Sequence, residues 1–266
     1  MNLRTIIVHA LLRAAAFGSL MDAAQADTLS NIKLAKKLRV GIDLGLPPYG
    51  TMDDKMRATG SDVGTAHLLA DDLGVELEIV PSTGANRIPF LLTHKIDVVI
   101  SSLSITPERE KVIAFSLPYG IIQVGVAAPA AMTIENLADL VGKTVAVSRG
   151  TAADQDATKA AKGINELMIA RYEDDATLIT AITTGQQDFV VTAPAQLREI
   201  NQKAPEKRMM MKLILRQNGY AIGLRKGETA LKARLDEFVK ANLANGKLGA
   251  IYKTYHGTEL PAKMPD

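Results

Sequence analysis

An arginine stands in the first turn of a predicted helix, directly after a stretch rich in hydroxyl groups. The segment 97–111 reads DVVISSLSITPEREK, in which a short apolar run leads into a turn containing Ser102 and Ser104. Thr106 and the proline after it are typical of a helix start, as the N-cap and the first helical residue. A cation at this place opposes the helix dipole, so Arg109 breaks a local rule beside free backbone N–H groups.

This arrangement of side chains could bind an anion such as a carboxylate. The turn amides and the serine hydroxyls would donate hydrogen bonds, and the guanidinium of Arg109 would hold two oxygen atoms at once. A second interpretation of the same residues is a surface arginine paired with Glu108 or Glu110. The residues of this segment leave both interpretations open.

Other reactive groups form no comparable pattern. The chain contains no cysteine, which excludes disulfides, thiolate metal sites and a cysteine nucleophile. The four histidines lack metal-ligand spacing, and neither a P-loop nor a G-x-S-x-G motif occurs. We therefore expect no metal, no cofactor and no catalytic residue.

The composition is that of an ordinary soluble globular protein. Hydrophobic residues make up 47% and charged residues 23% of the 266 residues, enough for one large domain or two small ones. The formal net charge is only +2, so no polybasic surface indicates binding to nucleic acid.

The first 26 residues are expected to form an export signal. Arg4 precedes a mostly apolar stretch over residues 5–20, and an A-x-A cleavage pattern follows at residues 24–26. The stretch is too short and too interrupted for a spanning helix, and no later stretch is long enough. Because a lipid-modified cysteine is also excluded, we expect a soluble protein outside the cytoplasm.

Helices and strands alternate along the chain, which predicts an α/β protein with mainly parallel sheets flanked by helices. Strands are expected at residues 38–44, 75–80, 97–100, 144–147, 167–170, 188–192 and 210–215. Helices are expected at residues 62–73, 86–94, 133–141, 152–162, 175–184, 194–201, 228–243 and 248–255.

Extended segments at 121–128 and 218–224 interrupt this alternation and predict two lobes joined by a hinge. Lobe 1 would contain residues 27–123 and 222–266, and lobe 2 would contain residues 124–221. The alternative is one continuous doubly wound sheet.

Several short motifs together form a family pattern. They are Gly41-Ile42-Asp43 with Pro47-Pro48-Tyr49, then Asn86-Arg87-Ile88-Pro89, then Asp97 through Ser116-Leu117-Pro118-Tyr119, and finally Arg149-Gly150-Thr151 and the segment 251–257. Over about residues 38–257 the chain resembles the polar amino-acid group, family 3, of the periplasmic solute-binding proteins of ABC importers. The resemblance implies a type II clamshell with a two-strand hinge. It also implies a periplasmic monomer that closes on an amino acid or related small carboxylate and delivers it to a membrane permease.

The resemblance assigns roles to residues of lobe 1. Arg109 would hold the carboxylate of the ligand bidentately, and Ser102 and Ser104 would add hydrogen bonds to the same group. Asp43 and Tyr49 would line the end of the pocket that receives the ligand side chain.

Lobe 2 would contribute fewer contacts. Thr151, at a predicted helix start, would reach the carboxylate or its neighbour when the lobes close. Arg149 is a second candidate cation for an anionic ligand, with a solvent-facing loop arginine as the other interpretation. Thr192 is a further candidate, at the end of the strand expected at residues 188–192.

The chain departs from the family pattern at one position. Where the family commonly has an aspartate that binds the α-ammonium group, this chain has Ala193. Either Asp43 or Asp188 replaces that aspartate, or the ligand is not a standard α-amino acid. Opines and betaine-like solutes therefore remain candidates.

Two classes of function follow from the resemblance. One is a binding protein that performs no chemistry, which the sequence favours. The other is an enzyme on the same scaffold, since the cyclohexadienyl dehydratases acting on arogenate or prephenate also resemble this family. Such an enzyme needs an acid or base in the cleft. The candidates are Asp43 and His94, and nothing in the sequence places His94 in the cleft.

Overall fold

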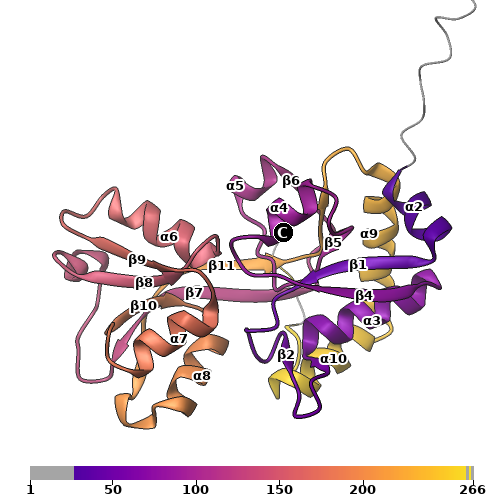
Figure 1. Ribbon diagram of the computed structural model, residues 1–266. Coiled ribbons are helices and arrows are strands. Elements are labelled where there is room, and N and C mark those ends of the chain that lie inside the picture. Colours follow the sequence, from indigo (N-terminus) through magenta and orange to yellow (C-terminus); the bar gives the residue numbers. More distant parts are fainter. Residues whose placement is uncertain (1–26, 262–263, 265–266) are drawn as a thin grey trace, which may run out of the picture.

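The computed structural model describes residues 27–261 and residue 264; the expected export signal, residues 1–26, lies outside this part. The described chain forms two lobes that lie side by side, each built around its own sheet (Figure 1). Two long strands, β7 (Gly120–Pro129) and β11 (Met209–Tyr220), run across the middle and connect them. We call the part around the first sheet lobe 1 and the part around the second sheet lobe 2.

The sheet of lobe 1 has the strand order β4-β1-β5-β12-β6. These strands are β4 (Glu76–Pro81), β1 (Lys37–Ile42), β5 (Val98–Val99), β12 (Gly223–Arg225) and β6 (Ile113–Phe115). The helices of this lobe are α2 (Thr28–Ala35), α3 (Ser61–Leu73), α4 (Arg87–Leu92), α5 (Pro107–Glu110), α9 (Thr229–Ala244) and α10 (Lys247–His256). A small hairpin joins β2 (Thr51–Met52) to β3 (Ala58–Thr59).

The sheet of lobe 2 has the order β11-β7-β10-β8-β9. Its remaining strands are β10 (Phe189–Thr192), β8 (Thr144–Ser148) and β9 (Met168–Tyr172). Its helices are α6 (Ala152–Ala161), α7 (Asp175–Thr183), α8 (Pro194–Lys203) and the short 3-10 turns η1 (Leu137–Leu140) and η2 (Pro205–Lys207). As predicted, the class is α/β with two lobes, not one continuous sheet.

Both sheets are mixed. Strand β1 pairs in parallel with β4 and β5, and β8 pairs in parallel with β9 and β10. The antiparallel pairs of these sheets involve the crossing strands β7 and β11, or β12, which returns the chain to lobe 1. Strand β10 is buried along its whole length, as parallel strands covered by helices on both faces are.

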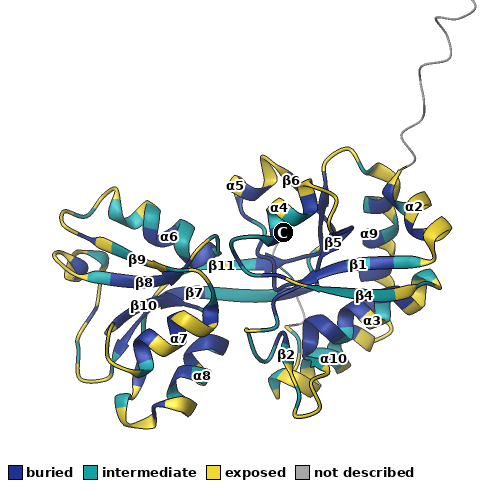
Figure 2. Ribbon diagram, in the orientation of Figure 1, coloured by how far each residue is buried: buried dark blue, intermediate teal, exposed yellow. Residues whose placement is uncertain are grey.

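Each lobe has a hydrophobic core of its own. Val98 and Ile100 belong to a buried cluster in lobe 1, whereas Val126 and Val147 belong to one in lobe 2. Figure 2 shows the buried residues concentrated on the strands of each lobe. Each cluster lies mainly in one lobe, although the lobe 1 cluster also includes Ala195 of α8, so the lobes can move against each other while most of each core stays buried.

Two predicted elements differ from the structure. The helix expected at residues 133–141 is only the 3-10 turn η1, whose start is fixed by a capping box between Asn136 and Asp139. The second crossing is the end of β11, which continues unbroken from residue 209 to residue 220. Helix α2 and the β2/β3 hairpin were not predicted, since both are short and lack a clear apolar period.

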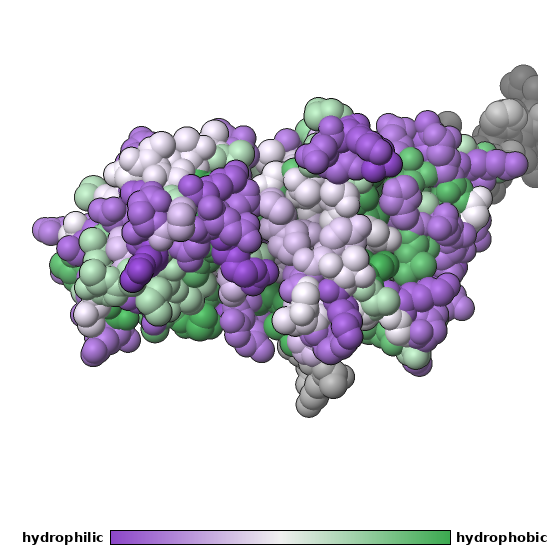
Figure 3. All heavy atoms as spheres, turned by 90° about the horizontal axis from the view of Figure 1, so that it is seen from below, coloured by the Kyte–Doolittle hydropathy of each residue, from purple (hydrophilic) through white to green (hydrophobic). Residues whose placement is uncertain are grey.

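One face of the molecule is seen from below in Figure 3. Hydrophilic side chains cover much of the face shown in Figure 3, with smaller hydrophobic areas between them. In the part of the chain that the structure describes, no helix combines the length and apolar character that crossing a membrane requires.

Candidate functional site

A small cavity of about 60 Å³ lies between the two lobes. Typical ligand pockets hold roughly 300–1,000 Å³, so the lobes leave little space between them here. The described residues that line it are Asp43, Leu46, Gly84, Arg87, Ser102, Ser104, Ile122, Val124, Ser148, Thr151, Ala152, Ala153, Asp175, Val191, Thr192, Ala193 and Gln196.

The polar lining residues come from the carboxyl ends of strands in both sheets. Asp43 directly follows β1, and Ser102 follows β5 in lobe 1. In lobe 2, Ser148 ends β8 and Thr192 ends β10. Ligands of open α/β sheets bind outside the carboxyl ends of parallel strands, and here two such edges face each other.

The serine turn of lobe 1 is held in an unusual backbone conformation. Ser102 has a φ of 40°, in the left-handed region that side chains other than glycine rarely adopt. The backbone N–H of Ser102 lies near the buried carboxylate of Asp62 and partly offsets the rise in the pKa of that group that burial causes. Nη1 of Arg87 donates to the carbonyl oxygen of Ser101 at 2.7 Å. Such strain persists only where the surroundings enforce it, and it concentrates at functional sites.

Arg109 lies in the predicted helix start but is buried, with 2% of its surface exposed. The N-cap is confirmed, since the side chain of Thr106 accepts a hydrogen bond from the backbone N–H of Arg109. Its guanidinium donates from Nη1 to the carbonyl of Ser104 at 2.9 Å and from Nη2 to the carbonyl of Gly150 at 3.2 Å. The second bond crosses from lobe 1 to lobe 2.

The charge of Arg109 has no acidic partner among the described residues, and its Nε has no hydrogen bond. Burial lowers the pKa of Arg109, and the nearby cations Arg87 and Arg216 lower it further. Buried charges in proteins are usually paired, so this guanidinium is suited to an anion that arrives from outside.

Arg87 and Asp43 are further buried charges on the wall of the cavity in lobe 1. Burial and the neighbouring charge of Asp175 raise the pKa of Asp43 to about 6, against a smaller opposing effect of Arg87. Burial lowers the pKa of Arg87, although the charges of these two acids raise it. The cavity therefore offers both signs of charge at low dielectric, where electrostatic interactions are strong.

The wall in lobe 2 is a network of hydrogen bonds around Asp175. Its Oδ1 accepts hydrogen bonds from the hydroxyl of Ser148 and from Nε2 of Gln196, the latter at 2.6 Å. The hydroxyl of Thr192 donates to Oε1 of the same Gln196 side chain. Burial raises the pKa of Asp175, against the effect of these hydrogen bonds. The network fixes the orientation of the carboxylate.

Five of the residues predicted to form the site meet at this cavity. They are Asp43, Ser102, Ser104, Thr151 and Thr192. Thr151 is the N-cap of α6, as the sequence indicated, and its side chain accepts the backbone N–H of Asp154.

Three other predicted residues do not line the cavity. Arg109 is not among the lining residues, but its guanidinium donates to the carbonyl of Ser104, which is one of them. Tyr49 is 5% exposed in the core of lobe 1, with its ring centroid 6.0 Å from that of Tyr220 and 4.8 Å from that of His256. The exposed Arg149 pairs with Glu173 at 2.7 Å, so the structure agrees with the solvent-facing interpretation.

Asp175 and Gln196 were not predicted as site residues from the sequence. For Arg87, packing between elements of the lobes was favoured at least as much as a position in the cleft. Asp175 is the first residue of α7, directly after the N-cap Asp174. The pair of aspartates at a helix start after a parallel strand was the available signal. Asp188, which was considered as a replacement carboxylate, is exposed and does not line the cavity.

The buried carboxylate of Asp62 supports a prediction about stability. Burial raises the pKa of Asp62 from its ordinary value of 3.8 to about 7. The folded state therefore binds more protons than the unfolded state between these values, and this group's contribution to stability is lost as pH rises through 7. Denaturant titrations at about pH 5 and about pH 8 should show a fall in the free energy of unfolding that Asp62→Asn reduces. Equal falls in the wild type, in Asp62→Asn and in the exposed control Asp188→Asn would contradict this assignment.

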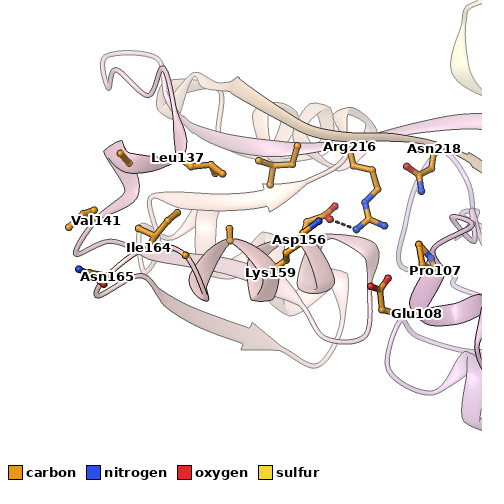
Figure 4. A pocket seen from close by; sticks show the side chains of 14 residues that line it. Pro107, Glu108, Leu137, Val141, Asp156, Lys159, Ile164, Asn165, Arg216 and Asn218 are labelled. Atoms are coloured by element: carbon orange, nitrogen blue, oxygen red, sulfur yellow. Dashed lines mark hydrogen bonds and ion pairs between the residues drawn. The ribbon is translucent and has the colours of Figure 1, made fainter.

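A larger hollow, of about 990 Å³, runs along lobe 2 toward Pro107 and Glu108 of lobe 1 (Figure 4). Most of its wall is apolar, and Figure 4 shows Asp156 and Arg216 pointing toward each other. This acid and base are already paired, and the other charged residues of the hollow, Glu108 and Lys159, are exposed. The charges of the interlobe cavity are buried and have no ion pair among the described residues, which makes that cavity the better candidate for a polar ligand.

The sequence and the fold both match known proteins. The family described as "Bacterial extracellular solute-binding proteins, family 3" matches residues 38–258. The L-cystine-binding protein TcyJ of Escherichia coli is 27% identical over 244 residues, which cover 91% of each chain. A crystal structure of a mutant of ArgBP from T. maritima has a TM-score of 0.78 at 32% identity, covering 87% of this chain and all of that one.

An enzyme is also among the relatives. The cyclohexadienyl dehydratase of Pseudomonas aeruginosa is 27% identical over 205 residues, which cover 75% of each chain. Its identity to this chain equals that of the cystine-binding relative, although over a shorter length.

Proposed function

The chain belongs to the bacterial extracellular solute-binding proteins of family 3, and from this premise we propose that it captures an amino acid or related small carboxylate between its lobes and delivers it to an ABC importer. The enclosure of unpaired charges of both signs between two separately folded lobes carries the proposal. An amino acid is a small zwitterion, so it offers one partner for each sign of charge.

The carboxylate of the ligand is placed at the serine turn. In the proposal Ser102 and Ser104, which line the cavity, donate hydrogen bonds to it. Arg109 lies outside the lining and donates to the carbonyl of Ser104, and because it lacks an acidic partner among the described residues its guanidinium turns to the carboxylate when the ligand binds. Asp43 lies at the other end, and Thr151 approaches from lobe 2. Each charge-assisted hydrogen bond contributes about 1.5–3 kcal/mol.

The ligand enters when the lobes rotate apart about the crossing strands. The proposal assigns residues 27–123 and the returning segment from residue 222 to lobe 1, and residues 124–221 to lobe 2. It describes an exported, soluble monomer without a lipid anchor that works in the periplasm and meets the permease with the outer surfaces of its lobes. Family membership and the presence of a buried core centred in each lobe support this description.

A panel of solutes tests the proposal. The chain from Asp27 onward is mixed with standard amino acids, opines, betaines and small carboxylates, and its thermal unfolding is measured. A ligand that binds only the native state stabilises it by about 2.7 kcal/mol at a hundredfold excess over Kd. We expect at least one solute carrying a carboxylate to raise the melting temperature, and to make the protein more compact by X-ray scattering. A panel without any stabilising solute would contradict the proposed ligand class.

A dehydratase is the second candidate, and the raised pKa of Asp43 favours it, because a group with a pKa of about 6 can exchange protons near neutral pH. His94, the other acid–base candidate, is exposed in the turn after α4 and does not line the cavity. Incubation with arogenate or prephenate distinguishes the two functions. Loss of the cyclohexadienyl ring absorbance pattern and release of an aromatic product would replace the binding function by an enzymatic one.

A further inference from the structure

Two carboxylates face the interlobe cavity from opposite lobes. Asp43 follows β1 in lobe 1 and Asp175 begins α7 in lobe 2, and they are 6% and 5% exposed. Arg87 is the third charged residue among the described residues that line the cavity. Two acids and one base therefore line the cavity, and a positively charged group of a ligand would make the numbers of negative and positive charges equal.

In each of these carboxylates one oxygen atom accepts hydrogen bonds from the protein, and the other oxygen atom has no donor among the described residues. Oδ1 of Asp43 accepts the backbone N–H of Gly45 at 2.9 Å. Oδ1 of Asp175 accepts from Ser148 and Gln196. Within the described part of the chain, the Oδ2 atom of neither aspartate accepts a hydrogen bond or joins an ion pair. Two acceptor atoms on buried residues thus remain available to a ligand inside the cavity.

The two acids oppose each other electrostatically. The charge of Asp175 is the second largest cause, after burial, of the raised pKa of Asp43. Of the other charged groups that act on this pair, Arg87 favours the ionised forms and Asp174 disfavours them. Closing the lobes brings the two like charges together in a buried space, which costs free energy unless one is protonated or a cation lies between them.

The lining also indicates which kind of cation fits. Among the described residues that line the cavity there is no aromatic side chain. Quaternary ammonium groups are typically bound on aromatic faces, whereas carboxylate oxygens bind cations that donate N–H hydrogen bonds. The two free oxygens therefore suit a protonated amine or a guanidinium better than a betaine.

We propose that a positively charged N–H group of the ligand binds between Oδ2 of Asp43 and Oδ2 of Asp175, and that this bridge allows the lobes to close. The proposal rests on the proposed function and specifies its ligand. Asp175 then supplies the lobe 2 carboxylate that is missing from the sequence at Ala193. The ligand is a small carboxylate with a free ammonium or guanidinium group.

The first test compares matched solutes and matched variants by calorimetry. Each amino acid that stabilises the wild type is paired with its N-trimethyl betaine, such as glycine with glycine betaine. We expect the amino acid to bind and the betaine not to bind. Asp175→Asn and Asp43→Asn should each weaken binding roughly 10- to 150-fold, the loss of one charge-assisted hydrogen bond. The exposed control Asp188→Asn should bind as the wild type does.

Two results of this test overturn the proposal. One is a betaine that binds as tightly as its parent amino acid. The other is unchanged affinity in both Asp175→Asn and Asp43→Asn. Using both variants keeps the test decisive if one of them folds poorly, which circular dichroism would reveal.

The second test needs no ligand. Scattering by the ligand-free wild type should indicate a more compact protein at about pH 5 than at about pH 8, because protonation of one acid removes the repulsion. Asp175→Asn should be equally compact at both values. Identical curves for both proteins at both pH values overturn the role of the pair in closure. If no solute of the panel binds, the proposed function fails, and this measurement still decides whether the acids control closure.

Discussion

Arg109→Ala is expected to weaken ligand binding by more than about a hundredfold, since it removes a pair of charge-assisted hydrogen bonds of about 1.5–3 kcal/mol each. The guanidinium is 2% exposed, carries no acidic partner among the described residues, and has an unpaired Nε. The carboxylate of the ligand is the anion that would complete its coordination. The substitution also removes the bond to Gly150 that joins the lobes. Both losses act on the closed, liganded state.

Calorimetry with the best solute of the panel measures this effect, and denaturant titration shows whether the fold is retained. Arg149→Ala is the matched control, because Arg149 is an exposed arginine at the same interlobe contact and pairs only with Glu173 among the described residues. Arg109→Lys should recover little affinity, since an ammonium cannot reproduce the bidentate geometry. Wild-type affinity in Arg109→Ala would remove this residue from the site.

Gly84→Ala is expected to hold the clamshell partly open. A Cβ atom at this position would lie 2.7 Å from the carbonyl oxygen of Arg149 and 2.8 Å from Cγ2 of Thr151, both in lobe 2. The contact with a backbone atom cannot be relieved by a side-chain rotation, so the lobes have to separate. We expect ligand affinity to fall about tenfold or more, as closure contacts worth at least 1.4 kcal/mol are lost. The free energy of unfolding should change little, because the clash exists only in the closed state.

Scattering with and without a saturating ligand measures closure directly. The wild type should become more compact on ligand addition, and Gly84→Ala should do so less. Gly249→Ala provides the control, because a Cβ atom there meets nothing within 4 Å. Full compaction together with wild-type affinity in Gly84→Ala would show that the contact seen here is not required for binding.

The sequence predicted the parts of the site that local rules determine. Asp43 and Thr192 follow apolar strands, and Thr151 is a helix cap, so their places at strand ends and helix starts were readable. Asp175 and Gln196 were missed because their convergence depends on how α7 and α8 pack against the sheet of lobe 2. No local pattern encodes that packing.

Two further features, the position of Tyr49 and the length of β11, also differ from the expectation. Tyr49 follows two prolines in a turn, which suggested a ring presented to the pocket. The ring of Tyr49 instead packs in the core of lobe 1, edge-on to the ring of Tyr220. The continuity of β11 was hidden as well, since its register shifts near Met211 and Ile214 interrupt the alternation that marks a strand.

The crossing strands β7 and β11 hydrogen-bond to each other from one lobe to the other. Paired in this way, they cannot slide past one another without breaking the ladder, so the lobes move chiefly by bending a two-stranded ribbon. The bending energy of this ribbon determines the equilibrium between the open and closed forms of the free protein. That equilibrium is the same whichever ligand binds afterwards. A substitution that alters the ribbon should therefore multiply all affinities by the same factor, whereas a substitution in the cavity changes their ratios. Tightness of binding and choice of ligand can thus be changed independently in this protein.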